Sequence, residues 1–309
     1  MDKFWESLGG KLAERWLSVA APALMFWLGG LLMWMIGRGG PAALRQPLTD
    51  LAKLPVGSQL IGLVVVLLGV AASGWIVTQL VNPVLRFLQG YGPLWRPVRT
   101  RLVKRAQTKF DEIGSEFAAL APAVLLTPDS ATPQQRAAYV RLTRRQRRLP
   151  GPGRFMPTAI GNTLRAAESH PIDKYGLDVV TVWPHLWLLL PDVVRTEVAA
   201  ARARLNAGVA AGIWGVLFTG FAPWSVWAVP TGLITMIGCY LVWLPGRTEA
   251  YADLVQSAID LYRRALYEQL RWPMPGNPAE ERASGRLLSS YLSRGLSGST
   301  PTFVASSSE

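Results

Sequence analysis

Hydrophobic positions gather in four runs of the chain that contain no charged side chain. Three of these runs, residues 16–36, 60–81 and 223–244, are each about twenty residues long, which is the length that a helix needs to cross the hydrocarbon core of a bilayer. The fourth run, residues 207–222, is shorter, but the Ala-rich stretch before it can extend its helix. The pattern predicts an all-α integral membrane protein with four transmembrane helices in two hairpins.

The polar stretches between these runs define the rest of the predicted organisation. Residues 37–59 separate the first two spans as an external loop, and residues 82–206 form a large helical domain on the cytoplasmic side. Pro223 stands between the third and fourth spans. Because a helix interior does not tolerate proline well, it favours a tight hairpin at this point. The remaining predicted segments are an N-terminal segment (1–15), cytoplasmic helices (245–294) and a Ser-rich disordered tail (295–309).

Periodicity within the polar stretches predicts individual helices. From Val98 on, apolar residues recur at steps of three and four, which is the stripe of an amphipathic helix. Thr132 and Asn277 are each followed by proline, which is typical of a helix start, and residues 158–169 read as a short helix that stops before Pro171. After the fourth span we expect a helix with an apolar face made of Leu254, Ala258, Leu261, Tyr262, Ala265 and Leu270.

One further apolar run, residues 177–190, is too short to cross a membrane. Runs of about 10–14 apolar residues are more typical of core helices or interfacial segments, and Trp side chains favour the membrane–water boundary. We therefore expect a broken helix at the cytoplasmic membrane surface. Asp178 and His185 are its only titratable side chains and are candidates for a gate or a proton-sensitive site. The alternative is that Asp178 lies at a helix start and His185 at the headgroups.

Composition agrees with a membrane assignment and adds an orientation. Half of the 309 residues are hydrophobic and 17% are charged, against about 25% in soluble proteins. The net charge is +12, and residues 86–165 hold fifteen Lys and Arg against four Asp and Glu. Basic loops stay in the cytoplasm. We expect a multi-pass protein of the cytoplasmic membrane with both termini inside, from a bacterium, since Arg greatly exceeds Lys.

The basic residues form two groups that we expect to contact anionic lipid headgroups. The helix after the second span carries Arg99, Arg101, Lys104 and Arg105, and a dense cluster follows at Arg144, Arg145, Arg147 and Arg148. A basic residue near an anionic membrane surface contributes about 1 kcal/mol. A solvated surface is the alternative. Nucleic-acid binding is disfavoured, because no nucleic-acid motif and no interleaved aromatic residues accompany the arginines.

Signatures of catalysis and of metal binding are missing from the sequence. It contains no P-loop, no dinucleotide-binding glycine motif, no nucleophile elbow and no HExxH or CxxC motif. The single cysteine, Cys239, and the two histidines are too few for a structural zinc site. We expect no cofactor and no enzymatic activity. The weaker alternative is an enzyme that acts on lipid through His170, Asp173, Asp178 and His185.

Assembly is the role that the uncharged spans favour. Small residues at helical spacing, which let helices approach closely, are Gly69 and Ser73 in the second span and Gly208, Gly212 and Gly215 in the third. We expect a homo-oligomer that forms a channel or perturbs the membrane under the control of its cytoplasmic helices. The alternative is a membrane scaffold that recruits a cytoplasmic protein partner through the basic domain.

Overall fold

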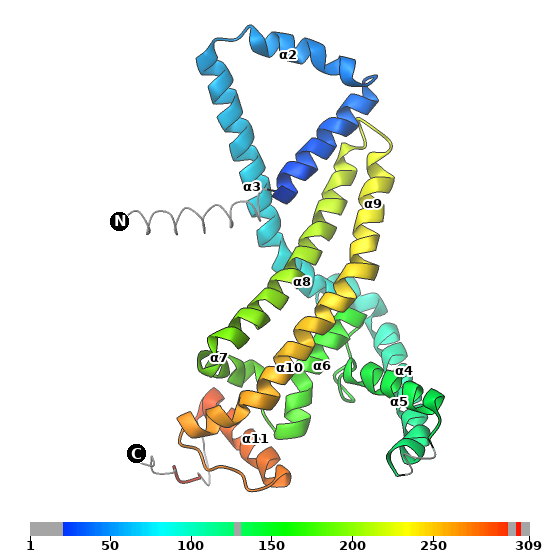
Figure 1. Cartoon of the computed structure of the whole chain (residues 1–309), viewed down its shortest axis with the longest axis vertical. Coiled ribbons are helices and arrows are strands. Elements are labelled where there is room, and N and C mark those ends of the chain that lie inside the picture. Colours follow the sequence, from blue (N-terminus) through cyan, green and yellow to red (C-terminus); the bar gives the residue numbers. More distant parts are fainter. Residues whose placement is uncertain (1–20, 127–130, 296–300, 304–309) are drawn as a thin grey trace. The chain divides into compact units, whose positions relative to one another are not determined.

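A computed structural model describes residues 21–126, 131–295 and 301–303, and every regular element in these ranges is a helix (Figure 1). The expected N-terminal segment 1–15 and most of the expected tail (residues 296–300 and 304–309) lie outside the described residues. Contacts divide the chain into two units. Unit 1 comprises residues 1–85 and 206–244, and unit 2 comprises residues 86–205 and 245–309.

Unit 1 contains the uncharged runs of the sequence. Its helices in chain order are Ala21–Gly37, η1 (Pro41–Leu44), α2 (Arg45–Ala52), most of α3 (Val56–Leu88), the end of α8 (Asp192–Phe218), η3 (Thr219–Phe221), α9 (Ala228–Gly238) and the π-helix η4 (Cys239–Trp243). The helix α8 is unbroken from the polar stretch into the expected third span, as the sequence predicts.

Two helices in the described part of the chain are long and apolar enough to cross a membrane. They begin at Val56 and at Ala228. The helices Ala21–Gly37 and Pro41–Ala52 meet at a bend of 107° and would add a third if the pair is one span. The third expected span, residues 207–222, consists of the end of α8, η3 and one turn residue, and it is not among these helices.

Helix α3 has no polar face in its first half. The consecutive residues Val65, Val66, Leu67 and Leu68 are 62%, 61%, 42% and 63% exposed. Four consecutive residues of an α-helix point in four directions, so apolar side chains lie on every side of this helix. Such a helix is stable in the core of a large protein or in a bilayer.

The segment 37–59, expected as a loop, contains the amphipathic helix α2. Leu48 and Leu51 lie on it as exposed apolar side chains, and Arg45, Asp50 and Lys53 supply its polar side. Because α2 joins helix 21–37 to α3, the three helices form the sides of a triangle (Figure 1). The sequence pattern missed α2 because eight residues are too few to establish helical periodicity.

Helix 21–37 packs on the end of α8 through glycines and aromatic rings. A Cβ atom added at Gly29 would lie 2.8 Å from the Phe218 ring, and one added at Gly30 would lie 2.2 Å from the Phe221 ring. The ring centroids of Phe26 and Trp214 are 4.7 Å apart. Only glycine leaves room for the two rings at these positions, so this contact depends on the Gly-Gly pair.

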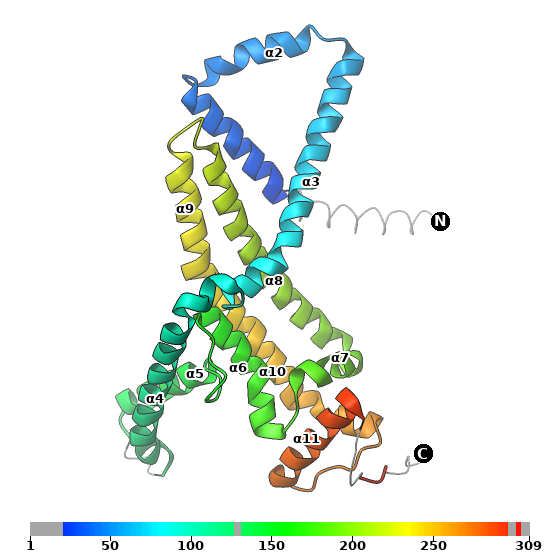
Figure 2. The same cartoon turned by 180° about the vertical axis from the view of Figure 1, so that it is seen from behind.

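The end of α8 and helix α9 lie side by side, joined by a turn that contains Pro223 (Figure 2). A Cβ atom at Gly215 would lie 2.9 Å from the Gly232 carbonyl oxygen, and one at Gly232 would lie 2.5 Å from that of Gly215. Residues 223–227 belong to the connection, so the expected fourth span begins at Ala228. Backbones that approach this closely are typical of membrane helices.

A π-helical turn joins α9 to α10 (Leu244–Gln269). The Leu244 N–H donates to the Cys239 carbonyl, five residues back. The next residue, Pro245, has no N–H to donate, and its ring would clash with a carbonyl in a regular α-helix. The wider turn accommodates the proline, so the helix runs on where the sequence allowed either continuation or a bend.

Unit 2 is a bundle of amphipathic helices around one hydrophobic core. Its elements are η2 (Pro93–Trp95), α4 (Arg96–Leu125), α5 (Pro133–Arg147), α6 (Ala159–Tyr175), α7 (Val179–Leu189), the start of α8, α10 and α11 (Pro278–Arg294). The core consists mainly of side chains from α7 and α10, with Leu288 from α11. The starts of α5 and α11 lie at the predicted N-caps, Thr132 and Asn277.

Two expectations for unit 2 are wrong in detail. Helix α6 does not stop at Pro171. It continues through His170 and Pro171 and ends at Tyr175, where Gly176 follows in the left-handed conformation. After Pro245, the buried apolar residues of α10 are Ala252, Val255, Ala258, Ile259, Leu266 and Tyr267, whereas Leu261 is 73% exposed. Of the expected apolar face, Ala258 lies in the core and Leu254, Tyr262 and Leu270 pack against it, so the expectation fails at Leu261.

Helix α7 is a single helix with one face in the core and one face exposed. Val179, Val182 and Leu186 are buried, while Val180 and Leu188 on the other face are 69% and 75% exposed. Pro184 lies inside the helix without interrupting it, so the expected break is absent. The segment 177–190 is thus part of the core of unit 2, and Val180 and Leu188 remain as exposed apolar side chains on its outer face.

Helix α11 docks on the end of α6 through two glycines. A Cβ atom at Gly285 would lie 2.0 Å from the Tyr175 carbonyl oxygen, and one at Gly176 would lie 2.1 Å from that of Arg282. Beside them the Ser289 hydroxyl accepts a hydrogen bond from the Asp178 N–H at 2.9 Å. Because both obstacles are backbone atoms, a larger residue would displace α11.

We predict opposite effects for two glycine substitutions in helix interiors of unit 2. Gly285→Ala forces a Cβ atom into backbone and should destabilise the fold by about 1–3 kcal/mol. Gly114→Ala is the matched control: nothing lies within 4 Å of its added Cβ atom, so it should stabilise α4 by about 0.5–1 kcal/mol. Thermal unfolding of the full chain in detergent measures both. A Gly285→Ala midpoint equal to or above wild type would contradict the docking.

Candidate functional site

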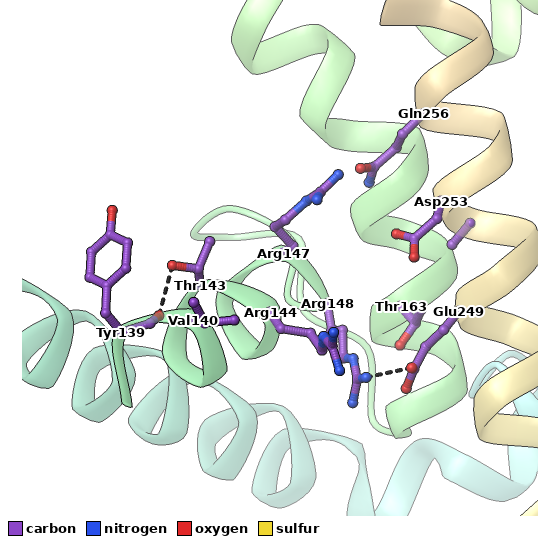
Figure 3. Close-up of a pocket in the computed structure, with 11 residues that line it drawn as sticks. Tyr139, Val140, Thr143, Arg144, Arg147, Arg148, Thr163, Glu249, Asp253 and Gln256 are labelled. Carbon is purple, nitrogen blue, oxygen red and sulfur yellow. Dashed lines mark hydrogen bonds and ion pairs between the residues drawn. The ribbon is translucent and has the colours of Figure 1, made fainter. Parts of the chain in front are cut away.

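A cavity of about 450 Å³ lies between α5, α6 and α10 in unit 2 (Figure 3). The consecutive helices α5 and α6 and the distant helix α10 supply its walls, and most of its lining side chains are polar. The lining residues are Tyr139, Val140, Thr143, Arg144, Arg147, Arg148, Thr163, Glu249, Ala252, Asp253 and Gln256. Its volume falls within the range of about 300–1,000 Å³ that is usual for small-molecule sites.

Local interactions fix the helix α5 that carries the arginines. Its start is a capping box: the Gln135 N–H donates to the Thr132 hydroxyl at 3.2 Å, and the Thr132 N–H donates to the Gln135 side chain at 2.8 Å. The Tyr139 ring stacks on Phe117 of α4 with centroids 5.0 Å apart. The polar side of α5 is thereby turned toward α6 and α10.

Helix α6 is anchored at its start by two buried side chains. The Thr158 hydroxyl accepts from the Gly161 N–H at 2.9 Å and donates to the Leu88 carbonyl at 2.7 Å. The Asn162 amide accepts from the Met156 N–H at 2.7 Å and donates to the carbonyl of the same residue at 2.9 Å. These bonds satisfy buried backbone groups and hold the wall that contributes Thr163.

Charged groups of both signs line the cavity, and they are not all paired. Arg148, at the end of α5, forms an ion pair with Glu249 of α10. Arg144, Arg147 and Asp253 have no ion pair or hydrogen bond through their side chains among the described residues. Figure 3 shows Arg144 beside Arg148, and Arg147 extending toward Gln256. The cavity thus offers two free guanidinium groups.

A buried amide connects the cavity to His170. Gln256 is 4% exposed, and its Nε2 group donates to His170 Nδ1 at 3.3 Å. His170 Nε2 lies 3.1 Å from the Leu149 carbonyl. A neutral imidazole that carries its proton on Nε2 satisfies both contacts. Burial is the largest cause that lowers the pKa of His170 below its usual 6.5, and it outweighs the hydrogen bond to Leu149.

The eight residues expected at lipid headgroups fall on two separate surfaces. Arg99, Arg101, Lys104 and Arg105 lie exposed along α4, where Arg101, Lys104 and Arg105 line a shallow groove with Lys109. Of the α5 cluster, Arg144, Arg147 and Arg148 line the cavity and Arg145 does not, although Arg144 and Arg147 are exposed like Arg145.

The two titratable residues of α7 have separate surroundings. Asp178 caps α7: its carboxylate accepts from the Val180 N–H at 3.3 Å and from the Thr181 hydroxyl at 2.7 Å. His185 is exposed on the outer face, with Nδ1 3.3 Å from the Thr181 carbonyl. This geometry fits the structural alternative for Asp178, because its oxygens already serve the helix start.

The small residues expected at helix contacts differ in their surroundings. Ser73 accepts a hydrogen bond from Trp27 Nε1 at 3.1 Å, and Gly215 lies against Gly232 as described above. Gly208 is buried, and a Cβ atom at Gly212 would lie at an ordinary 3.9 Å from Cys239. A Cβ atom at Gly69 would meet nothing within 4 Å in the described part of the chain.

Several residues of the cavity and of the helix–helix contacts could not be recognised from the sequence pattern. Glu249 and Gln256 stand in a long amphipathic helix, and only the fold brings them to α5. Gly29 and Gly30 show no recurring interval of small residues. Within the described ranges no three His, Cys, Asp or Glu side chains gather as a metal site.

Comparisons with protein-family models, with curated proteins and with solved structures give no match.

We predict that protonation of His170 destabilises unit 2. Because the pKa is lower in the folded state, the unfolded state takes up the proton first, so this contribution is fully present above about pH 6.5 and is lost as the pH falls below it. Between pH 7 and pH 5.5, His170→Gln should remove the contribution of His170 to the fall of the unfolding temperature with falling pH. The control His185→Gln, at an exposed position, should keep it. Thermal unfolding against pH measures this, and identical slopes for wild type and His170→Gln would contradict it.

Proposed function

We propose that the chain is a multi-pass protein of a bacterial cytoplasmic membrane, with unit 1 in the bilayer, unit 2 in the cytoplasm and both termini inside. The observation that carries the proposal is the all-round apolar surface of α3, which water would not tolerate. The basic excess of residues 86–165 supports the orientation. In this arrangement the basic face of α4 lies against anionic headgroups, and amphipathic α2 lies at the opposite surface.

We expect single cysteines to report this topology. In a Cys239→Ser background, Gln46→Cys in α2 and Gln107→Cys in α4 place thiols at exposed positions. A membrane-impermeant maleimide added to intact spheroplasts should label Gln46→Cys and should label Gln107→Cys only after lysis. Labelling of both without lysis, or of neither, would contradict the proposed orientation.

Within this arrangement we propose a homo-oligomer that opens a path through the membrane under the control of unit 2. No charged side chain lies in helix 21–37, in α3 before Arg86, or in residues 206–244. Transport coupled to ions usually needs such a group within a span, whereas a hydrophobic path that opens by wetting does not. Helix α10 carries one cavity wall and continues through the π turn into α9, which offers a route for control.

We predict that Pro245 is needed for this control. Purified protein in liposomes should release trapped potassium well above protein-free vesicles and should be oligomeric in nanodiscs. Pro245→Ala lets regular helical hydrogen bonds form through the π turn, so it should lower the release several-fold without changing the oligomer. Pro275→Ala, in the connection before α11, is the control and should release potassium like wild type. A monomer without release would overturn the proposed function.

A further inference from the structure

We infer that the cavity between α5, α6 and α10 binds a ligand that carries a phosphate group together with hydroxyl or ammonium donors. The inference deepens the proposed function by naming the chemistry that unit 2 would sense. Binding at this cavity is measurable without any membrane flux, so the two proposals can fail separately.

The two free arginines supply the anion-binding part of the site. Arg144 and Arg147 are three residues apart on α5, so they lie on the same face of the helix. Both line the cavity and neither has an ion-pair or hydrogen-bond partner in the part of the chain that the structure describes. A guanidinium group can donate two parallel hydrogen bonds to a phosphate, whereas a lysine ammonium acts as a point charge.

The charge balance of the lining favours an anion but limits its charge. Three arginines face two carboxylates, and one arginine is already paired with Glu249. Helix α5 contains five arginines and no acidic residue, which adds a positive field. The free carboxylate of Asp253, on the α10 wall of the cavity, counteracts this positive field. A phosphate fits the arginine side, and a donor group fits the side of Asp253.

Neutral side chains also offer hydrogen-bond acceptors. The Thr163 hydroxyl donates to the Ala159 carbonyl at 3.1 Å, so its remaining capacity is as an acceptor. Gln256 uses its Nε2 group toward His170, and its carbonyl oxygen accepts from no described residue. These acceptors match hydroxyl or ammonium groups on the ligand. A phosphate ester of a polyol or an amino alcohol has both parts, and about 450 Å³ exceeds the need of a bare phosphate.

A soluble phosphate ester and a phospholipid headgroup share this chemistry. The experiment uses the full chain in nanodiscs of neutral phosphatidylcholine, titrated with glycerol 3-phosphate by calorimetry at constant ionic strength. Arg144→Gln/Arg147→Gln should weaken binding at least tenfold. The control Arg141→Gln/Arg145→Gln removes the same charge from the same helix outside the cavity and should change binding less than about twofold. Equal loss in both double variants would overturn the site, since it would show attraction by net charge alone.

A third variant separates binding from folding. Asp253→Asn removes an unpaired, exposed carboxylate from the lining, so it should tighten the binding of inorganic phosphate several-fold. If Asp253 only stabilised the fold, its replacement would not tighten the binding of phosphate. If Asp253→Asn leaves phosphate binding unchanged or weakens it, the proposed geometry is wrong.

Replacing part of the phosphatidylcholine by phosphatidylglycerol identifies the source of the ligand. Competition against glycerol 3-phosphate would support the inference with a lipid headgroup as occupant, and unchanged binding would support it with a soluble ester. Absence of binding at millimolar glycerol 3-phosphate and phosphate, with no effect of phosphatidylglycerol, overturns it. Binding without potassium release would leave the site standing and overturn only the proposed function.

Discussion

Three helices change their chemical character along their length, and the division of the chain follows from that change. Helix α3 is uncharged from Val56 until Arg86, α8 is uncharged after Arg204, and the helix that begins at Ala228 is uncharged until Arg247. A charged side chain at the centre of a bilayer costs about 2.5–3.5 kcal/mol on insertion scales. Each helix therefore has an end that suits hydrocarbon and an end that suits water, and the boundaries between the two units fall at these transitions.

Glycine contacts organise both units, for different reasons. In a bilayer, where we propose that unit 1 lies, packing one apolar helix on another brings no hydrophobic gain, so close approach at Gly215 and Gly232 would supply dispersion contacts instead. In unit 2 the same device at Gly176 and Gly285 brings α11 near enough for Leu288 to reach the core. Both contacts place backbone against backbone, where adaptation to a larger side chain is limited.

Elements with local determinants could be predicted from the sequence, and elements that depend on distant contacts could not. The capping signals at Thr132 and Asn277 mark true helix starts, because a cap needs only residues within one turn. Of the apolar face expected for α10, Ala258, Leu254, Tyr262 and Leu270 lie in or against the core, but Leu261 is exposed, since several sides of the helix are apolar and only the partner helices select one. The cavity could not be predicted because its ion pair joins Arg148 to Glu249, which lie 101 positions apart.

Unit 2 consists of two pieces of chain separated by residues 206–244, and this order has a consequence for biosynthesis. The second piece, from Pro245 on, supplies Val255, Ile259 and Leu288 to the core. Translation proceeds at about 5–20 residues per second. The first piece must therefore wait for seconds, with its apolar face uncovered by these residues, until the second piece has been synthesised.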